Sequence, residues 1–270
     1  MLNFISTPIG NLNDISLRAI DVINSSDILY AEDTRNTRKL LDHIKIKKKC
    51  YSFHEHNEDK VIPDILINLK NNINISILSD AGTPAISDPG YKLIQKCIKE
   101  DINFTLIPGP TAVISSLIMS GLPTNKFTFN GFFPRKKNEK DKCLLELSNE
   151  EKTSIFFESS KRIEATLEAL MNYFDDDRKI VLCKELTKIH ENVLRGNAKT
   201  ILKEIQDKNL SLKGEFAILI GGTKKKNLNT TIDKRIKDEF LKKLSASDSA
   251  KLISLITGKN KRDIYKIFID

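Results

Sequence analysis

Three turns rich in glycine and proline are candidates for ligand binding, because each directly follows an apolar run typical of a strand. Glycine and proline let main-chain N–H and C=O groups approach a ligand closely. The carboxyl ends of parallel strands meet at one edge of a sheet, where open α/β proteins bind their ligands. We therefore expect a backbone-lined pocket that suits an uncharged or cationic cofactor. The turns are Pro8-Ile9-Gly10, Asp80-Ala81-Gly82-Thr83-Pro84 and Pro108-Gly109-Pro110-Thr111-Ala112.

Two common nucleotide-binding motifs are absent from the sequence. No G-x-G-x-x-G follows the first apolar run, and no G-x-x-x-x-G-K-[ST] occurs in the chain. An ordinary dinucleotide-binding fold is therefore disfavoured, and a P-loop enzyme is excluded. A simpler interpretation of the second turn is a tight connection to a helix, with Asp88 as the cap and Pro89 at the first helical position. That interpretation leaves Asp80 to Pro84 unexplained, so we favour a ligand loop.

Acidic and basic side chains follow the second apolar run. Glu32 and Asp33 end that run, and Arg35 and Arg38 lie three residues apart on one face of the helix that follows. The helix dipole favours acids at a helix N-terminus, which is the simpler explanation of Glu32 and Asp33. Two arginines on one face suit contact with phosphates, so we favour a role in positioning RNA.

A histidine-rich stretch follows the third apolar run. His54 and His56 alternate with Glu55 and Asn57, so in an extended chain the two imidazoles share a face. No third ligand at a useful spacing accompanies them. We therefore expect substrate binding or ordinary hydrogen bonding here, and no metal site.

Apolar runs and helical patterns alternate five times in the first part of the chain, which predicts an α/β fold with a mostly parallel sheet and right-handed crossovers. A Gly-Pro break at 121–123 is the expected boundary to a second α/β unit. The chain is thus divided into domains at 1–121, 122–223 and 224–270. Strands are predicted at 2–6, 28–31, 51–54, 75–78 and 104–107, and then at 127–129, 154–157, 180–183 and 216–220.

The last part of the chain is strongly basic. From Lys224 to Asp270 there are 13 Lys or Arg against 6 Asp or Glu, which gives +7 of the net charge of +8. The stretch 223–231 is typical of a linker, and short helices follow, with Ser247 and Gly258 as start and stop and Asn260 as the next cap. Our hypothesis is that this part, with Lys259, Lys261 and Arg262, grips RNA phosphates. The alternative is a helical pair that simply packs on the body.

The bulk composition is that of a soluble globular protein. The chain has 270 residues, of which 40% are hydrophobic and 30% charged. Its four cysteines lie 40 or more residues apart, so no zinc or redox motif is predicted. The N-terminus lacks the pattern of a signal peptide, and no run of 18 apolar residues occurs. We expect a cytoplasmic protein.

Nine sequence blocks together carry a family resemblance. They are Thr7–Leu12, Ala31–Arg35, Ser52–Glu58, Ser79–Gly90, Pro108–Ala112, Gly131–Lys137, Phe157–Ser159, Lys184–Lys188 and Lys213–Glu215. The chain resembles the RsmI family of S-adenosylmethionine-dependent 2′-O-ribose methyltransferases, which act on a cytidine of 16S ribosomal RNA. This resemblance implies the tetrapyrrole-methylase (class III methyltransferase) fold: two α/β domains with the cofactor between them, a small helical C-terminal module, and a homodimer.

The resemblance also implies where S-adenosylmethionine binds. Two departures from the family pattern lie outside these positions: Ser160-Lys161 replaces the usual Pro-His before Arg162, and Gly221-Gly222 lacks an acidic residue. The turn before Arg162 is therefore expected to differ. The implied cofactor residues are Pro8, Asp80, Gly82, Thr83, Pro84, Thr111 and Ala112 in the first domain, and Phe157, Glu185, Leu186, Gly214, Glu215, Phe216 and Ala217 in the second.

Other residues are expected to serve the RNA and the chemistry. Arg135 and Lys136 follow an aromatic strand end, which makes an RNA contact as well supported as a merely solvated face. A ribose hydroxyl is a poor nucleophile, so a nearby base would help methyl transfer. Asp33 and Glu55 are the favoured bases, from a set that also holds Glu32, His54 and Glu185. The expected RNA contacts are Glu32, Arg35, Arg38, His54, His56, Asn57, Arg135 and Lys136.

Two other functions are considered. One is a small-molecule methylase of the same fold that acts on a tetrapyrrole-like anion, which the blocks Ala31–Arg35 and Ser52–Glu58 disfavour. The other is a ribosome- or RNA-binding protein without catalysis, which the intact cofactor loops disfavour. We therefore expect 16S ribosomal RNA or the small ribosomal subunit as the partner.

Overall fold

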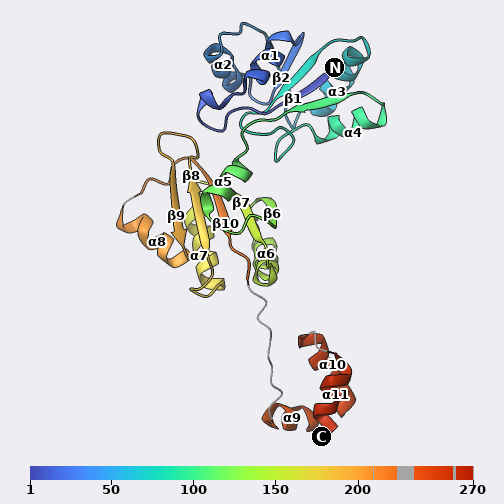
Figure 1. Ribbon diagram of the computed structural model, residues 1–270, viewed down its shortest axis with the longest axis vertical. Coiled ribbons are helices and arrows are strands. Elements are labelled where there is room, and N and C mark those ends of the chain that lie inside the picture. The colour runs from blue at the N-terminus through green and yellow to red at the C-terminus, as the bar shows by residue number, and fades with distance from the viewer. Residues whose placement is uncertain (209, 224–233, 258–259, 270) are drawn as a thin grey trace. The chain divides into compact units, whose positions relative to one another are not determined.

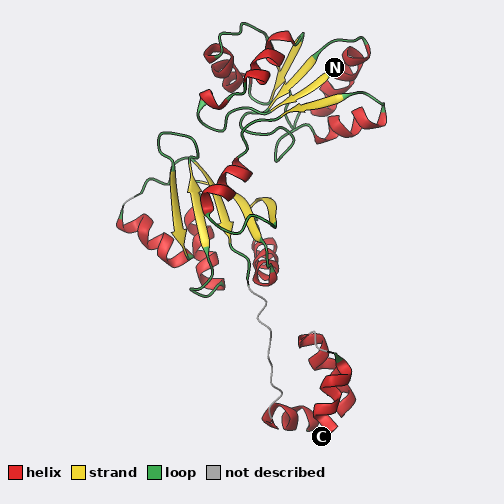
Figure 2. Cartoon of the chain, viewed as in Figure 1, coloured by secondary structure: helices red, strands yellow, loops and turns green. Residues whose placement is uncertain are grey.

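The computed structural model describes residues 1–208, 210–223, 234–257 and 260–269. It divides into two compact units, Met1–Gly222 and Thr223–Asp270, here called the body and the tail unit. Strands of the described residues belong to the body, in two separate sheets (Figures 1 and 2). None of the described helices is long and apolar enough to cross a membrane.

The first sheet has five strands, all parallel, as the alternating pattern predicts. Its order is β3-β2-β4-β1-β5, so β1 lies between β4 and β5. Leu2 pairs with Ile75 on one side and with Phe104 on the other. The carboxyl ends of all five strands therefore lie along one edge. The strands are β1 (Leu2–Ile5), β2 (Ile28–Ala31), β3 (Cys50–Ser52), β4 (Ile75–Leu78) and β5 (Phe104–Ile107).

Two helices cover each face of the first sheet. Residues of α1 (Leu17–Ser25) and α2 (Thr34–His43) share one buried cluster with Ile5, Leu29 and Leu78. Residues of α3 (Glu58–Lys70) and α4 (Tyr91–Lys99) share another with alternate strand residues such as Phe4 and Ile77. Right-handed crossovers explain this arrangement. Connections that lead the chain toward β3 place their helices on one face of the sheet, and connections that lead it toward β5 place theirs on the other.

The second sheet is mixed, with the order β6-β7-β10-β8-β9. Only β6 and β7 pair in parallel, and the other three pairs are antiparallel. The strand β9 was not predicted, because the segment NVLRG carries only two apolar residues and forms a half-buried edge. The strands are β6 (Phe127–Phe132), β7 (Thr153–Ser159), β8 (Ile180–Lys184), β9 (Asn192–Gly196) and β10 (Glu215–Ile220).

Helices on opposite faces also enclose the second sheet. On one face, α6 (Lys137–Asn149), α7 (Ile163–Tyr173) and α8 (Ala198–Asp207) bury a large apolar cluster. On the other face, α5 (Ala112–Ser120) packs through Val113 and Leu117 against strand residues that include Ala217. The helix α5 thus leaves the first sheet at the end of β5 and packs on the second sheet. The boundary after residue 121 remains a prediction.

The tail unit is a small helical unit with its own core. It contains α9 (Lys234–Leu241), α10 (Ala246–Thr257) and α11 (Lys261–Ile269). The helix α10 begins at Ala246, one residue before the predicted start at Ser247, and Ser245 caps it, because its Oγ accepts from Asp248 N at 3.1 Å. Asn260 caps α11 as predicted, accepting from Arg262 N at 2.9 Å. The predicted linker, apart from Thr223, and the predicted stop at Gly258 lie outside the described residues.

Candidate functional site

The turns after β1 and β4 are joined by an antiparallel bridge. Thr7 N donates to Gly82 O at 2.9 Å, and Gly82 N donates to Thr7 O at 3.0 Å. The Thr7 hydroxyl donates to Ser79 O at 3.0 Å, and the Ser79 hydroxyl donates to Gly82 O at 2.6 Å. Two turns that lie more than 70 residues apart in sequence are therefore fixed to each other by main-chain bonds.

The turn after β5 lies against the same two segments. An added Cβ on Gly109 would lie 3.0 Å from Ser6 Cβ, and one on Gly82 would lie 3.8 Å from Pro110 O. Gly82 also has φ +83, a conformation that a side chain would strain. The three glycine- and proline-rich turns therefore gather at one sheet edge, where the sequence predicts them. This brings together the first-domain residues predicted for the cofactor: Pro8, Asp80, Gly82, Thr83, Pro84, Thr111 and Ala112.

The predicted cofactor residues of the second sheet also lie side by side. Ala217 of β10 pairs with Phe157 of β7. Glu185 N donates to Glu215 O, and Glu215 N donates to the Glu185 carboxylate, both at 2.9 Å. Gly214 is closely packed, since an added Cβ would lie 2.5 Å from Glu185 Cδ. The sheet edge at the end of β8 and the start of β10 is thus a single hydrogen-bonded unit.

The predicted cofactor residues of the first domain and those of the second sheet come into contact at the turn after β8. Asn11 N donates to Thr187 Oγ1 at 3.0 Å, and an added Cβ on Gly10 would lie 2.9 Å from Leu186 O. Ile9 is buried in the same apolar cluster as Leu186. The turn after β1 therefore contacts both the turn after β4 and the turn after β8.

The turn after β8 is strained and held by ion pairs. Glu185 and Thr187 have φ values of 50 and 65, in the left-handed region that non-glycine residues seldom adopt. Lys188 Nζ donates to Glu185 and to Glu215 at 2.9 Å each. Backbone strain of this kind concentrates at functional sites, where the surrounding bonds stabilise it.

A cavity of about 610 Å³ lies beside this turn. Its size is in the range of small-molecule sites. Apolar side chains from β8, β9, α8 and β10 form its walls, and charged residues from the turn after β8 line it too. Three predicted cofactor residues, Glu185, Gly214 and Phe216, are among its lining.

Half-buried acidic groups gather at the carboxyl end of β2 and in the turn after β4. Burial raises the pKa of Glu32, and the nearby Asp80 carboxylate adds to this increase. Burial, with Glu32 and Asp80, also raises the pKa of Asp88 to about 7. The Asp88 Oδ2 atom is buried without a hydrogen-bond partner. Carboxylates with a raised pKa in such a position are candidate proton acceptors.

Asp88 is therefore not the helix cap that the sequence predicts. The helix α4 begins at Tyr91, its N-cap is Gly90, and no side chain caps it. Asp80 contacts the N-terminus of α2, because its Oδ1 accepts from Asp33 N at 2.8 Å. The sequence shows an acidic residue at this place in the turn, but it could not show that the Asp88 side chain points inward.

Asp33, a predicted base, is held by its neighbour. Its carboxylate accepts from Arg35 N at 2.8 Å, Nε at 3.0 Å and Nη2 at 2.6 Å. These bonds with Arg35 lower the pKa of Asp33 to about 2. Asp33 is thus the N-cap of α2 and orients Arg35, while Arg38 is exposed on the same helix. A carboxylate so strongly bonded is a weak proton acceptor.

The histidine stretch forms a turn, so the predicted extended conformation was wrong. Asn57 N donates to His54 O at 3.0 Å, and His54 N donates to Asn57 Oδ1 at 2.8 Å, which closes the turn. The two imidazoles, His54 and His56, are still neighbours, with ring centroids 5.9 Å apart. His54 Nδ1 is buried without a partner, and Glu55, which lies between the two histidines in the sequence, is exposed. No group of metal ligands occurs among the described residues.

Arg135 and Lys136 lie in the segment between β6 and α6, and both are exposed. Lys136 is the N-cap residue of α6 and pairs with Glu139 at 3.2 Å. The guanidinium and ammonium groups are thus presented to solvent at the carboxyl end of β6, next to the end of β7.

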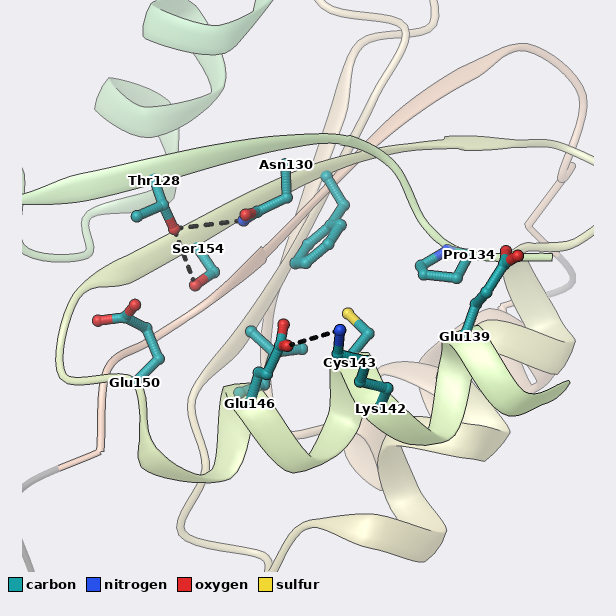
Figure 3. A pocket seen from close by; sticks show the side chains of 11 residues that line it. Thr128, Asn130, Pro134, Glu139, Lys142, Cys143, Glu146, Glu150 and Ser154 are labelled. Carbon is teal, nitrogen blue, oxygen red and sulfur yellow. Dashed lines mark hydrogen bonds and ion pairs between the residues drawn. The ribbon is translucent and has the colours of Figure 1, made fainter. Parts of the chain in front are cut away.

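A second cavity, of about 310 Å³, lies between β6 and α6 (Figure 3). Figure 3 shows that its polar side chains bond mainly to one another: Thr128 Oγ1 lies 3.2 Å from both Asn130 Nδ2 and Ser154 Oγ. Lys142 and Glu146 face each other across 3.9 Å. None of the predicted site residues lines this cavity.

Comparison with known sequences gives a consistent result. The family model for tetrapyrrole (corrin/porphyrin) methylases matches residues 1–202. A ribosomal RNA small subunit methyltransferase I of Xylella fastidiosa is 39% identical over 98% of this chain and 97% of its own length. A protein of the same name from Synechocystis is 35% identical over 100% of this chain and 98% of its own length. One from Thermotoga maritima is 40% identical, covering 82% of this chain and 98% of its own length.

Comparison with solved structures agrees on the fold. Diphthine synthase superposes with a TM-score of 0.63 at 13% identity, covering 82% of this chain and 89% of its own. The cobalt precorrin-4 methyltransferase CbiF gives 0.60 at 18% identity, covering 82% and 94%. The predicted α/β methylase fold and the family resemblance are thus confirmed. The chain belongs to the tetrapyrrole methylase family and, within it, to the ribosomal RNA small subunit methyltransferases I.

Proposed function

We propose that the protein transfers a methyl group from S-adenosylmethionine to the 2′-hydroxyl of a cytidine in small-subunit ribosomal RNA. The observation that carries this proposal is the near full-length identity of 35–39% to curated ribosomal RNA small subunit methyltransferases I. The sequence resemblance supplies the finer points, namely the ribose 2′-oxygen and the cytidine.

The residues at the sheet edge fit S-adenosylmethionine. A side chain is disfavoured at Gly82, which has φ +83, and at Gly109, where an added Cβ would lie 3.0 Å from Ser6 Cβ, so main-chain groups are proposed to face the ligand there. Within the three glycine- and proline-rich stretches, 8–10, 80–84 and 108–112, the one charged side chain is the Asp80 carboxylate, as suits a cationic ligand. When bound, the cofactor supplies an electrophilic methyl group on a sulfonium. The residues that would hold it are the two groups gathered around the turns after β1, β4, β5 and β8.

The chain's own residues position the ribose and accept its proton. Alignment of the acceptor oxygen with the methyl group supplies much of the rate. Glu32, His54 and Asp88 lie near one another at the strand ends, and Asp33 and Glu55 remain candidates beside them. The raised pKa of Glu32 and of Asp88 favours them as proton acceptors near neutral pH. Asp33 is better suited to orienting Arg35.

Exposed basic and polar groups are proposed to hold the RNA. Arginine and lysine bind phosphates, and aromatic or imidazole rings stack on unpaired bases. In the body these groups surround the ends of β2, β3 and β6, where Arg35, Arg38, His54, His56, Asn57, Arg135 and Lys136 lie. The basic tail unit adds further phosphate contacts in this proposal.

The protein acts in the cytoplasm, where ribosomal subunits are assembled, and it works as a homodimer. Light scattering of the purified protein at several concentrations tests the dimer, and a single species of about 31 kDa would rule it out, since one chain is 30.6 kDa. The small ribosomal subunit or its 16S RNA is the partner.

One experiment separates this function from its rivals. Purified protein is mixed with labelled S-adenosylmethionine and either naked small-subunit RNA, assembled small subunits or a uroporphyrinogen-type anion. We expect label on one cytidine ribose of the RNA or subunit and none on the tetrapyrrole. Label on the tetrapyrrole alone would identify a small-molecule methylase. RNA binding without any transfer would identify a non-catalytic RNA-binding protein.

A further inference from the structure

A fully bonded carboxylate is buried at the end of β7. The Glu158 side chain is 0% exposed. Its Oε1 accepts from Ser159 N at 2.7 Å and from Arg162 Nη2 at 2.5 Å. Its Oε2 accepts from Thr166 Oγ1 at 2.7 Å. This carboxylate therefore joins the end of β7 to the first turns of α7.

Arg162 extends this connection to a different segment. Besides Glu158, its Nη2 donates to Phe133 O at 3.1 Å, and its Nε lies 3.4 Å from Ser159 Oγ. Phe133 N in turn donates to Phe157 O at 3.0 Å. Both main-chain groups of Phe133 are thus bonded to the unit formed by β7 and Arg162.

Phe133 is the anchor for the basic residues after β6. Its ring is buried against Phe156, with centroids 5.2 Å apart. Arg135 and Lys136 follow two and three residues later and are exposed. The position of these two side chains therefore depends on the hydrogen bonds that hold the main chain of Phe133.

We propose that the Glu158–Arg162 ion pair is a positioning device for RNA recognition, which sets Arg135 and Lys136 against phosphates of the RNA substrate. The inference rests on the proposed function and deepens it. Arginine is suited to this task because its planar Nη2 group points its two N–H bonds in fixed directions, here toward a carboxylate and a carbonyl. A lysine ammonium would keep the charge beside Glu158 but would not hold the two bonds in that fixed geometry. Buried ion pairs contribute little net stability, which favours a role in specificity.

The test uses Arg162→Lys, with Arg162→Met as a second variant, in steady-state methylation of the RNA form that is labelled in the assay above. We expect KM for RNA to rise about tenfold, with kcat and KM for S-adenosylmethionine within about twofold of the original values. The slope of log affinity against log salt should fall by about 1–2, because up to two phosphate contacts are weakened.

A double-mutant cycle separates positioning from mere stability. In an Arg135→Ala/Lys136→Ala background, Arg162→Lys should raise KM for RNA no further, since the residues through which it acts are gone. The matched control is Arg178→Lys. Arg178 is buried, donates to Leu147 O at 2.7 Å, and lies just before the start of β8, at the end of the sheet opposite to the carboxyl end of β7. This control should lower the melting temperature but leave KM for RNA unchanged.

Distinct outcomes overturn the inference. An equal effect of Arg162→Lys in both backgrounds, or a rise in KM for S-adenosylmethionine instead of RNA, would contradict it. So would a KM for RNA that stays unchanged in a folded Arg162→Lys protein. If the original protein neither binds nor methylates RNA, the proposed function itself fails, which is a different result.

Discussion

At the scale of single residues, Asp88 occupies the energetically least favourable position in the site. Its carboxylate is largely buried, one oxygen has no hydrogen-bond partner, and Glu32 and Asp80 lie near it. The nearby Gly90 is buried, and an added Cβ there would lie 3.3 Å from Phe4 Cε1, so the chain after Asp88 is closely packed. Such an arrangement costs stability and is retained where function requires it.

We predict that Asp88→Asn stabilises the protein at alkaline pH and lowers its activity. The pKa of Asp88 is about 7 in the folded state against an ordinary 3.8, so folding favours the protonated form. The stability cost is therefore absent below pH 3.8, grows between pH 3.8 and 7, and is complete above pH 7. Allowing for partial solvent screening, the variant should gain about 1–2 kcal/mol at pH 8.

Urea unfolding at pH 8 and pH 4.5 measures this difference. Asp141→Asn on the exposed surface of α6 is the control and should show no gain that depends on pH. A gain of the same size at both pH values would mean that burial of the charge is not the cause.

We also predict that Glu32→Gln slows the chemical step more than Asp33→Asn does. The asparagine can still cap α2, and the original Asp33 carboxylate, with a pKa of about 2, accepts protons poorly. Single-turnover methylation at saturating cofactor should fall by at least tenfold for Glu32→Gln and by less than about threefold for Asp33→Asn. The reverse order of rates would restore Asp33 as the base.

These residues show what the sequence could and could not predict. It placed Glu32, Asp33, Asp80 and His54 at strand ends, because apolar runs mark where strands stop. It did not predict that Asp33 would bond Arg35, or that Asp88 would point inward, since both depend on side-chain direction within turns. The cofactor positions came from the family resemblance, not from spacing.

At the scale of elements, the turn after β1 is the connection on which the site depends. It contacts the turn after β4 through the Thr7–Gly82 bridge and the turn after β8 through Thr187. Local patterns predicted the strands and helices that carry these turns, with β9 as the strand that was missed. Contacts such as that of Asn11 with Thr187 could not be predicted, because they join residues 176 positions apart.

We predict that Gly10→Ala weakens cofactor binding about tenfold. An added Cβ would lie 2.6 Å from Thr187 Oγ1 and 2.9 Å from Leu186 O, so the two turns must separate. Such overpacking costs about 1–3 kcal/mol. Titration calorimetry with S-adenosylmethionine measures the loss of affinity.

Gly131→Ala is the matched control for that variant. Gly131 has φ +67 but nothing within 4 Å of an added Cβ, so alanine adds backbone strain without a clash. It should cost stability of about 1 kcal/mol and leave cofactor affinity unchanged. Equal losses of affinity in both variants would show that the contact between the turns does not matter for the cofactor.

At the scale of the whole molecule, catalysis is expected to reside in the body, while RNA affinity is expected to be shared between the body and the tail unit. All residues proposed for the cofactor and the base lie in the body, Met1–Gly222. The Thermotoga maritima relative aligns over 98% of its own length yet matches 82% of this chain. The part of this chain that this relative does not match is therefore about as long as the tail unit.

We predict that a protein truncated after Gly222 folds, binds S-adenosylmethionine with an affinity within about twofold of the full chain, and keeps kcat at saturating RNA. The tail unit has its own buried core, of Ala250, Ile253, Ile264 and Phe268, so the body does not need it to complete a core. RNA affinity should nevertheless fall about tenfold or more at low salt, and its salt slope should become shallower by at least 1, because phosphate contacts from a basic unit are lost. Filter binding at several salt concentrations measures both quantities. If affinity falls with an unchanged slope, the tail unit acts by means other than phosphate contact; if neither changes, it packs or assembles without touching RNA.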